Sequence, residues 1–199
     1  MEQGVEPVVG DHRQVGIARL HATLDALRDL RVRVASVDDV DAALDLIDEA
    51  AAWTASIGHE NWPSPFPRGP VVVNARAGDL YLAALDDAVV ATLALQWSDP
   101  YFWGETGDDE QAGYVHRVAV RRTHAGAGLG VRLLSWADGE IRARGRSLLR
   151  LDVVSHNASL RRYYENSGFA HVRDATGVWT SRDGTCRSWS TSLYERPCP

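Results

Sequence analysis

Two groups of residues in this sequence have types and spacings that suit chemistry. Gly126, Gly128 and Gly130 alternate through "THAGAGLGVRLL", directly ahead of a leucine-rich segment with helical spacing. A strand that ends in such a turn and opens a helix exposes backbone N–H groups at the positive end of the helix dipole. The turn is suited to hold a phosphate or a pyrophosphate, because no Cβ keeps the anion away from the backbone.

The second group is Asn157 and Tyr164, which stand seven positions apart in "NASLRRYYENSG". Seven helical steps of about 100° return to within roughly 20°, so both side chains lie on one helix face and Tyr163 points away from it. A phenol with a pKa of about 10 stays protonated at neutral pH and can donate a proton to a departing thiolate. Taken alone, Tyr164 also fits a core aromatic residue with a satisfied hydroxyl, and Asn157 fits a helix N-cap.

The glycine turn does not match the known nucleotide-binding loops. A Walker-type loop needs Lys and then Ser or Thr after its last glycine, whereas Val131 and Arg132 follow Gly130. A dinucleotide fingerprint has the spacing G-x-G-x-x-G, whereas the spacing here is G-x-G-x-G, and no early βαβ unit surrounds it. A helix start that merely needs flexible residues remains the alternative for the turn by itself.

The elements that must position these residues follow from the apolar spacing along the chain. Residues 1–30 are expected to form an N-terminal extension with an appended helix, and residues 31–199 a single domain. Four prolines between Pro63 and Pro70 predict a stiff loop without regular structure. Strands are predicted at 32–36, 80–85, 89–97, 114–120, 148–154, 170–173 and 188–194, and helices at 40–51, 129–144 and 157–168. This order predicts an α/β (α+β) fold.

Composition narrows the class of protein. The net charge of −6 over 199 residues argues against a general nucleic-acid binder. No run approaches the roughly 18 apolar residues of a membrane span, and the first residues lack the regions of a signal peptide, so a cytoplasmic protein is expected. Cys186 and Cys198 are expected to be free thiols, and no metal-type spacing joins them to the seven histidines.

The segments "VHRVAVRRTHAGAGLGVRLLSWA" and "LRLDVVSHNASLRRYYENSGF" together resemble the central half of the GNAT superfamily of acyl-CoA-dependent N-acyltransferases. The resemblance is firm over residues 114–170, and the element order is compatible from 32 to 196. It implies a central mixed, mostly antiparallel sheet flanked by helices, with the strands on either side of the central helix splayed apart.

The resemblance also implies acetyl-CoA as co-substrate, with its pyrophosphate on the backbone amides of the glycine turn and its pantetheine arm along the preceding strand. Tyr164 would lie near the sulfur. The cofactor-binding residues expected on this basis are Val118, Ala119, Val120, Ala125, Gly126, Ala127, Gly128, Leu129, Gly130, Asn157 and Tyr164. The family motif usually begins with Arg or Gln where this chain has Ala125, so Arg121, Arg122 or Arg132 is expected to supply the missing charge.

The base that deprotonates the acceptor amine stays open at this point. Tyr114, His116 and Val118 share one face of their strand if no bulge intervenes, and His116 has the most suitable reference pKa, about 6.5. A structural histidine is equally compatible with the sequence. Glu110, with Glu105, is the alternative in the acidic loop before the strand, which either is a solvated surface or attracts a cationic amine.

The sequence therefore predicts an N-acetyltransferase that moves acetyl from acetyl-CoA to a primary amine of a small molecule or peptide. Direct attack in a ternary complex is expected, since neither cysteine lies within the motifs. The alternative is a module that binds acyl-CoA or another ligand on the same fold and catalyses nothing. Trp179 and Trp189, near the C-terminal edge strands, are compatible with a homodimer.

Overall fold

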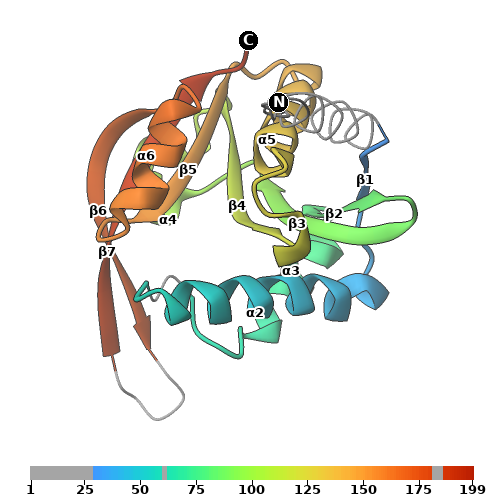
Figure 1. Cartoon of the computed structure of the whole chain (residues 1–199). Helices are drawn as coiled ribbons and strands as arrows, with labels where there is room; N and C mark the ends of the chain where they lie inside the picture. The colour runs from blue at the N-terminus through green and yellow to red at the C-terminus, as the bar shows by residue number, and fades with distance from the viewer. Residues whose placement is uncertain (1–28, 60–61, 181–185) are drawn as a thin grey trace, which may run out of the picture.

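The computed structural model describes residues 29–59, 62–180 and 186–199, so the helix expected within residues 1–30 lies outside the described residues. Seven strands form one sheet in the order β1-β2-β3-β4-β5-β7-β6 (Figure 1). Only β4 and β5 pair in parallel, and every other neighbouring pair is antiparallel. The strands are β1 (Arg31–Val34), β2 (Leu80–Leu85), β3 (Ala88–Gln96), β4 (Ala112–Val120), β5 (Leu148–Val154), β6 (Ala170–Thr180) and β7 (Cys186–Pro197). The predicted mixed, mostly antiparallel sheet is confirmed.

Helices cover both faces of the sheet. One face packs against α5 (Leu129–Ala143), and α6 (Ala158–Asn166) adds Leu160 and Tyr164 to the same core. The other face packs against α2 (Val40–Ser56) and α3 (Arg68–Ala77). The core residues predicted for the central helix are all buried: Leu133, Leu134, Ala137 and Ile141. We call these the α5 face and the α2 face of the sheet.

The prediction for the proline loop is wrong at its C-terminal end. Helix α3 begins at Arg68, with Pro67 as its N-cap and Pro70 inside its first turn. Proline is tolerated there, because the first N–H groups of a helix have no intrahelical acceptor and the fixed φ suits a helix start. Gly78 ends the helix with φ +76°, a left-handed conformation that glycine adopts without strain.

Turn residues set the remaining boundaries. The predicted β2–β3 hairpin is confirmed, and it turns at Asp86 and Asp87, which both have positive φ as a type I′ turn requires. The loop before β4 contains two short helical turns, α4 (Pro100–Trp103) and the 3-10 helix η2 (Gly104–Asp108). Further single 3-10 turns are η1 (Val37–Asp39) and η3 (Arg122–His124). Among the described residues, no helix is both long and apolar enough to cross a membrane.

Candidate active site

The centre of the sheet is forked. β4 and β5 pair from Ala112 opposite Leu148 to Val115 opposite Leu151. Both strands continue beyond these partners without pairing to each other, and Figure 1 shows them meeting at one end and parting toward α2. The predicted splaying of the strands beside the central helix is therefore present, and we call the parting point the fork.

A bulge in β4 decides which side chains face which side of the sheet. His116 lies opposite Ala94 and Ala119 opposite Thr92, so two residues of β4 face one residue of β3. Arg117 is in the bulge with φ +50°. Tyr114 and His116 therefore face α2, whereas Val118 packs against the α5 core. The sequence placed all three on one face only if no bulge intervened, and the bulge moves Val118 to the other face.

The glycine turn provides an open backbone cradle at the end of β4. Gly126 and Gly128 have φ values of +78° and +80°, and a Cβ on either would meet nothing within 4 Å. Along this described stretch, the N–H groups of Gly126, Gly128, Leu129, Gly130 and Val131 have no backbone or side-chain acceptor. Free N–H groups, open space and the N-terminus of α5 together fit an anion such as a pyrophosphate.

Two of the three arginines expected to assist this cradle have other partners. Arg121 donates to Glu49 of α2 at 3.1 Å, and the Arg122 backbone N–H donates to the same carboxylate at 3.2 Å. The guanidinium of Arg122 lies 3.6 Å from the ring centroid of Trp53, also on α2. Arg132, in the first turn of α5, has no ion-pair partner among the described residues and remains available to an anion.

Tyr164 lies on α6 with its ring packed edge-on against Tyr163 and Phe169. Burial raises the pKa of its hydroxyl well above the ordinary value, and the nearby Tyr163 and Asp152 add to the increase. The phenol therefore stays protonated at neutral pH, as a proton donor requires. Within the described part of the chain, its hydroxyl makes no hydrogen bond.

Asn157 is the N-cap of α6, as its sequence position predicted. Its side-chain oxygen accepts a hydrogen bond from the Leu160 N–H at 3.0 Å, and the residue is buried. The cap fixes the first turn of the helix that carries Tyr164 two turns later. A role for Asn157 toward the cofactor remains a prediction.

Tyr163 has a contact that the sequence did not reveal. Its hydroxyl lies so close to Gly130 that a Cβ there would be 2.5 Å from the oxygen. The absence of a side chain at Gly130 therefore makes room for a phenol from α6, whereas Gly126 and Gly128 provide left-handed backbone. The contact joins α6 to the first turn of α5, beside the anion cradle.

His116 sits between two carboxylates on the α2 face. Its Nδ1 is 3.2 Å from Oδ1 of Asp152 on β5, and its Nε2 is 3.8 Å from Oδ2 of Asp99. Oδ2 of Asp152 accepts from the Thr191 hydroxyl at 3.3 Å. Burial raises the pKa of Asp99, although the nearby His116 opposes the increase. The sequence pointed to His116, but not to either partner.

A signal for Asp152 was present in the strand pattern. In "LLRLDVV" the two charged residues, Arg150 and Asp152, alternate with buried Leu149, Leu151 and Val153. Alternation of this kind places both charges on the face opposite the apolar core. Two charges facing the interior of a protein are unusual and point to a function or a partner.

The other proposed base, Glu110, lies elsewhere. It is exposed, has φ +57°, and precedes β4 at the end where β4 and β5 are still paired. The structure therefore does not bring Glu110 to the fork. Glu105, in η2, is exposed as well.

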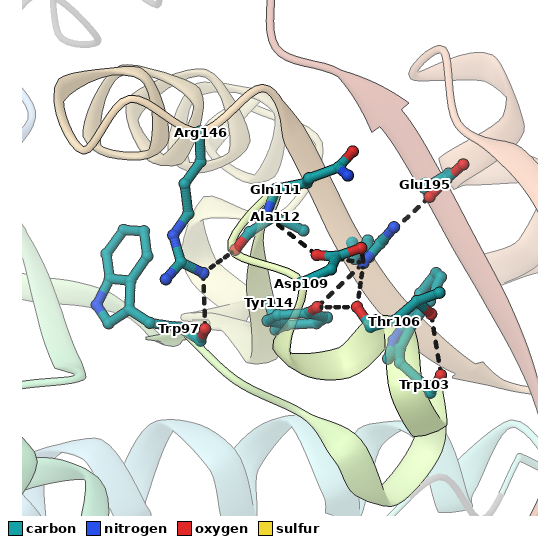
Figure 2. A network of polar contacts seen from close by, with 10 residues as sticks. Trp97, Trp103, Thr106, Asp109, Gln111, Ala112, Tyr114, Arg146 and Glu195 are labelled. Atoms are coloured by element: carbon teal, nitrogen blue, oxygen red, sulfur yellow. Dashed lines mark hydrogen bonds and ion pairs between the residues drawn. The ribbon is translucent and has the colours of Figure 1, made fainter.

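The acidic loop that contains these residues is held by a network of polar contacts that includes Thr106, Asp109, Tyr114 and Glu195 (Figure 2). Arg150 donates to the Thr106 carbonyl at 2.6 Å and lies 3.0 Å from Glu195 and 3.2 Å from Asp109. The Tyr114 hydroxyl donates to the same Thr106 carbonyl at 2.9 Å. This part of the acidic loop neutralises a buried cation of the protein, so its charges are structural.

Comparison with known proteins agrees with this geometry. The model of the Acetyltransferase (GNAT) family matches residues 46–169, more than half of the chain. The uncharacterized N-acetyltransferase YesJ of Bacillus subtilis (strain 168) is 29% identical over 150 residues, which are 70% of this chain and 82% of YesJ.

Solved structures share the fold at lower identity. A GNAT-family acetyltransferase from Listeria monocytogenes 4b F2365 has a TM-score of 0.66 at 20% identity, covering 84% of this chain and 94% of that one. yncA of Salmonella typhimurium, whose structure contains its cofactor acetyl-CoA, has a TM-score of 0.59 at 18% identity, with 85% and 94% covered. Because the family match spans most of the fork and both helices beside it, this chain belongs to the GNAT family of acetyltransferases and is an acyltransferase enzyme.

Proposed function

We propose that the protein transfers an acetyl group from acetyl-CoA to a primary amine by direct attack in a ternary complex. The observation that carries the proposal is the fork, which has a protonated phenol on the α5 face and a histidine–carboxylate pair on the α2 face. An acyl donor that enters from one face would meet an amine that enters from the other.

The residues that would hold acetyl-CoA are the backbone amides from Ala125 to Gly130, together with the side chain of Arg132. The open space above Gly126 and Gly128 fits an anion of this size. The main chain at Val118 and Val120 would accompany the arm beyond the fork. Bound there, acetyl-CoA supplies an activated thioester.

Tyr164 is the proposed general acid. Its hydroxyl donates to the leaving sulfur, and burial keeps that hydroxyl protonated until the sulfur departs. The proposal needs no acyl-enzyme: Cys186 and Cys198 both lie outside the two motifs, and burial raises the pKa of the Cys198 thiol to about 12.

The test combines binding with turnover. Titration calorimetry with CoA should show saturable binding, and a hundredfold excess over the dissociation constant should stabilise the fold by about 2.7 kcal/mol. Release of CoA thiol from acetyl-CoA should then accelerate with at least one member of a panel of amino sugars, polyamines, antibiotics and peptide N-termini. No CoA binding would refute the proposal. CoA binding without turnover on a broad panel would favour the non-catalytic module instead.

A further inference from the structure

Neither ring nitrogen of His116 is free to meet a substrate. Nδ1 is engaged with Asp152, and Nε2 is fully buried, without a hydrogen-bond partner among the described residues. The His116 side chain is 13% exposed, whereas that of Asp152 is 23% exposed. An amine that approaches this cluster therefore reaches the carboxylate before it reaches the imidazole.

Asp152 also has the right position in the strand. Leu151 is the last residue of β5 that pairs with β4, so Asp152 is the first residue past the fork. His116 occupies the same position on β4, directly after Val115. The charge of Asp152 also contributes to the raised pKa of Tyr164, which lies on the other face of the fork.

The nearby cation does not occupy the carboxylate. Arg117, in the β4 bulge, is near enough to Asp152 for the two charges to interact, but its hydrogen bond goes to the side chain of Asn74 on α3. Each oxygen of Asp152 has one hydrogen-bond partner. Oδ1 contacts Nδ1 of His116, and Oδ2 accepts from the Thr191 hydroxyl. A carboxylate oxygen accepts more than one hydrogen bond, so both retain capacity for an ammonium group.

We propose that Asp152 is the residue that contacts the acceptor: its carboxylate binds the substrate ammonium and takes its proton, while His116 and Asp99 are positioning residues behind it. This inference rests on the proposed function and names a group for the acceptor subsite. It replaces His116 as the direct base.

The proton and electron balance is complete. The nitrogen loses two protons on passing from ammonium to amide. The first proton goes to Asp152 and then to solvent, and the second goes to Tyr164. The nitrogen lone pair forms the bond to the acetyl carbon, and the C–S bond breaks with its electron pair on sulfur. Tyr164 gives its proton to that sulfur and is reprotonated by the second proton of the nitrogen.

Two kinds of acceptor separate this role from a structural one. Alkylamines are ammonium ions at neutral pH, whereas hydroxylamine is mostly uncharged and needs no base to become nucleophilic. The charged probe is whichever of butylamine, benzylamine, spermidine and alaninamide the wild-type protein acetylates fastest. Asp152→Asn should lower kcat/KM for that amine by about 100-fold or more and that for hydroxylamine by less than about fivefold.

Binding gives a readout independent of turnover. In titration calorimetry, Asp152→Asn should leave the Kd of CoA within about twofold and weaken the charged amine, titrated into the CoA complex, by at least about tenfold, or about 1.4 kcal/mol. Asp174→Asn is the matched control, because Asp174 pairs with His171 at 2.9 Å on exposed β6, and it should change neither value.

The role of His116 has its own test. His116→Asn keeps an N–H donor near the position of Nδ1 and should retain most of the activity, whereas His116→Phe should behave like Asp152→Asn. Equal losses for both acceptors in Asp152→Asn, or no loss for either, would overturn the inference. So would a wild-type protein that acetylates hydroxylamine but no charged amine. Failure to bind CoA would instead refute the proposed function.

Discussion

Two polar pairs lie next to each other on the α2 face of β4 and β5, and they differ in how completely they are satisfied. Tyr114 and Arg150 are partners in the ladder, one step before the last pair. His116 and Asp152 follow immediately after the strands part. Adjacent positions on one face of the same two strands therefore carry two polar networks. We call the one around Arg150 closed, because its groups bind one another, and the one around His116 open, because some of its buried atoms have no partner among the described residues.

The closed network surrounds Arg150, whose side chain is only 7% exposed. Its guanidinium binds Glu195, Asp109, the Thr106 carbonyl and the Tyr114 hydroxyl. Each of these partners is a group of the protein itself. Such a network stabilises the loop around η2 and leaves nothing for a ligand.

The open network leaves buried polar atoms without partners. Nε2 of His116 and Oδ2 of Asp99 are both buried without a hydrogen bond among the described residues, and they face each other at 3.8 Å. Unsatisfied buried polar groups cost stability, so their presence needs a reason. The difference arises at the fork, where the backbone ladder between β4 and β5 ends and buried polar groups beyond it lack a full set of partners.

The largest expected effect tests the closed network. Arg150→Met should lower the free energy of unfolding by about 3 kcal/mol, because Asp109 and Glu195 lose their buried partner. Denaturant unfolding measures this change. Arg31→Met is the matched control: Arg31 forms an exposed ion pair with Asp87, so the change should stay within about 0.5 kcal/mol. A loss of Arg150 that cost no more than the control would remove the distinction between the pairs.

The second prediction concerns the phenol across the fork from the open pair. Tyr164→Phe should lower kcat by about 100-fold and change the KM for acetyl-CoA by less than about threefold, because the hydroxyl acts only as the sulfur departs. Steady-state kinetics separate the two constants. Tyr163→Phe is the adjacent control and should keep kcat within about twofold. An unchanged kcat in Tyr164→Phe would exclude that phenol from the mechanism.

The third prediction concerns the glycine turn, where one added carbon atom should lower the affinity for CoA. Gly130→Ala should weaken CoA binding by about tenfold, or about 1.4 kcal/mol, because the new Cβ displaces the Tyr163 hydroxyl beside the turn. Adding Tyr163→Phe should restore most of the affinity, since the next ring atom is at an ordinary 3.6 Å. Calorimetry compares the two variants, and a double variant no better than the single one would contradict this reading of the contact.

The smallest expected effect is a gain in stability when Asp99 loses its charge. Burial raises the pKa of Asp99, so the folded protein binds its proton more readily than the unfolded chain, and the ionised carboxylate opposes folding above that raised pKa. Asp99→Asn keeps the cap to the Phe102 N–H and should add about 0.5–2 kcal/mol at neutral pH. This gain in stability should shrink as the pH falls through the raised pKa. The same substitution should decrease acetyl transfer to charged amines. Unfolding measured across pH checks the sign.

Much of the fold could be predicted, because local rules decide it. The β2–β3 hairpin follows from alternating apolar residues around Asp86 and Asp87, and α5 and α6 follow from apolar spacing and their flanking residues. The places of the glycine turn and of Tyr164 in the fold could be predicted, because both depend on spacing along one segment. Helix α3 was not predicted, because four prolines in a short stretch usually exclude a helix. Here the last two lie at the N-cap and in the first turn, where a helix tolerates proline.

The cluster of His116, Asp152 and Asp99 could not be predicted, because strand pairing and a loop bring these residues together. The bulge at Arg117 reverses the facing of Val118, and no residue type in "YVHRVAV" announces it. Asp99 reaches His116 from a loop, and Asp152 reaches it from the strand on the other side of the fork. Long-range contacts of this kind are set by tertiary structure, which rules based on local sequence do not describe.

The position of Glu49 limits how this enzyme can be redesigned. Its carboxylate, on the helix of the α2 face, holds both the side chain of Arg121 and the backbone of Arg122, where β4 becomes the glycine turn. Variants of α2 selected for new amines would thus disturb the anchor of the glycine turn whenever they alter this residue. Libraries that vary the acceptor preference should therefore keep Glu49 fixed and randomise other positions.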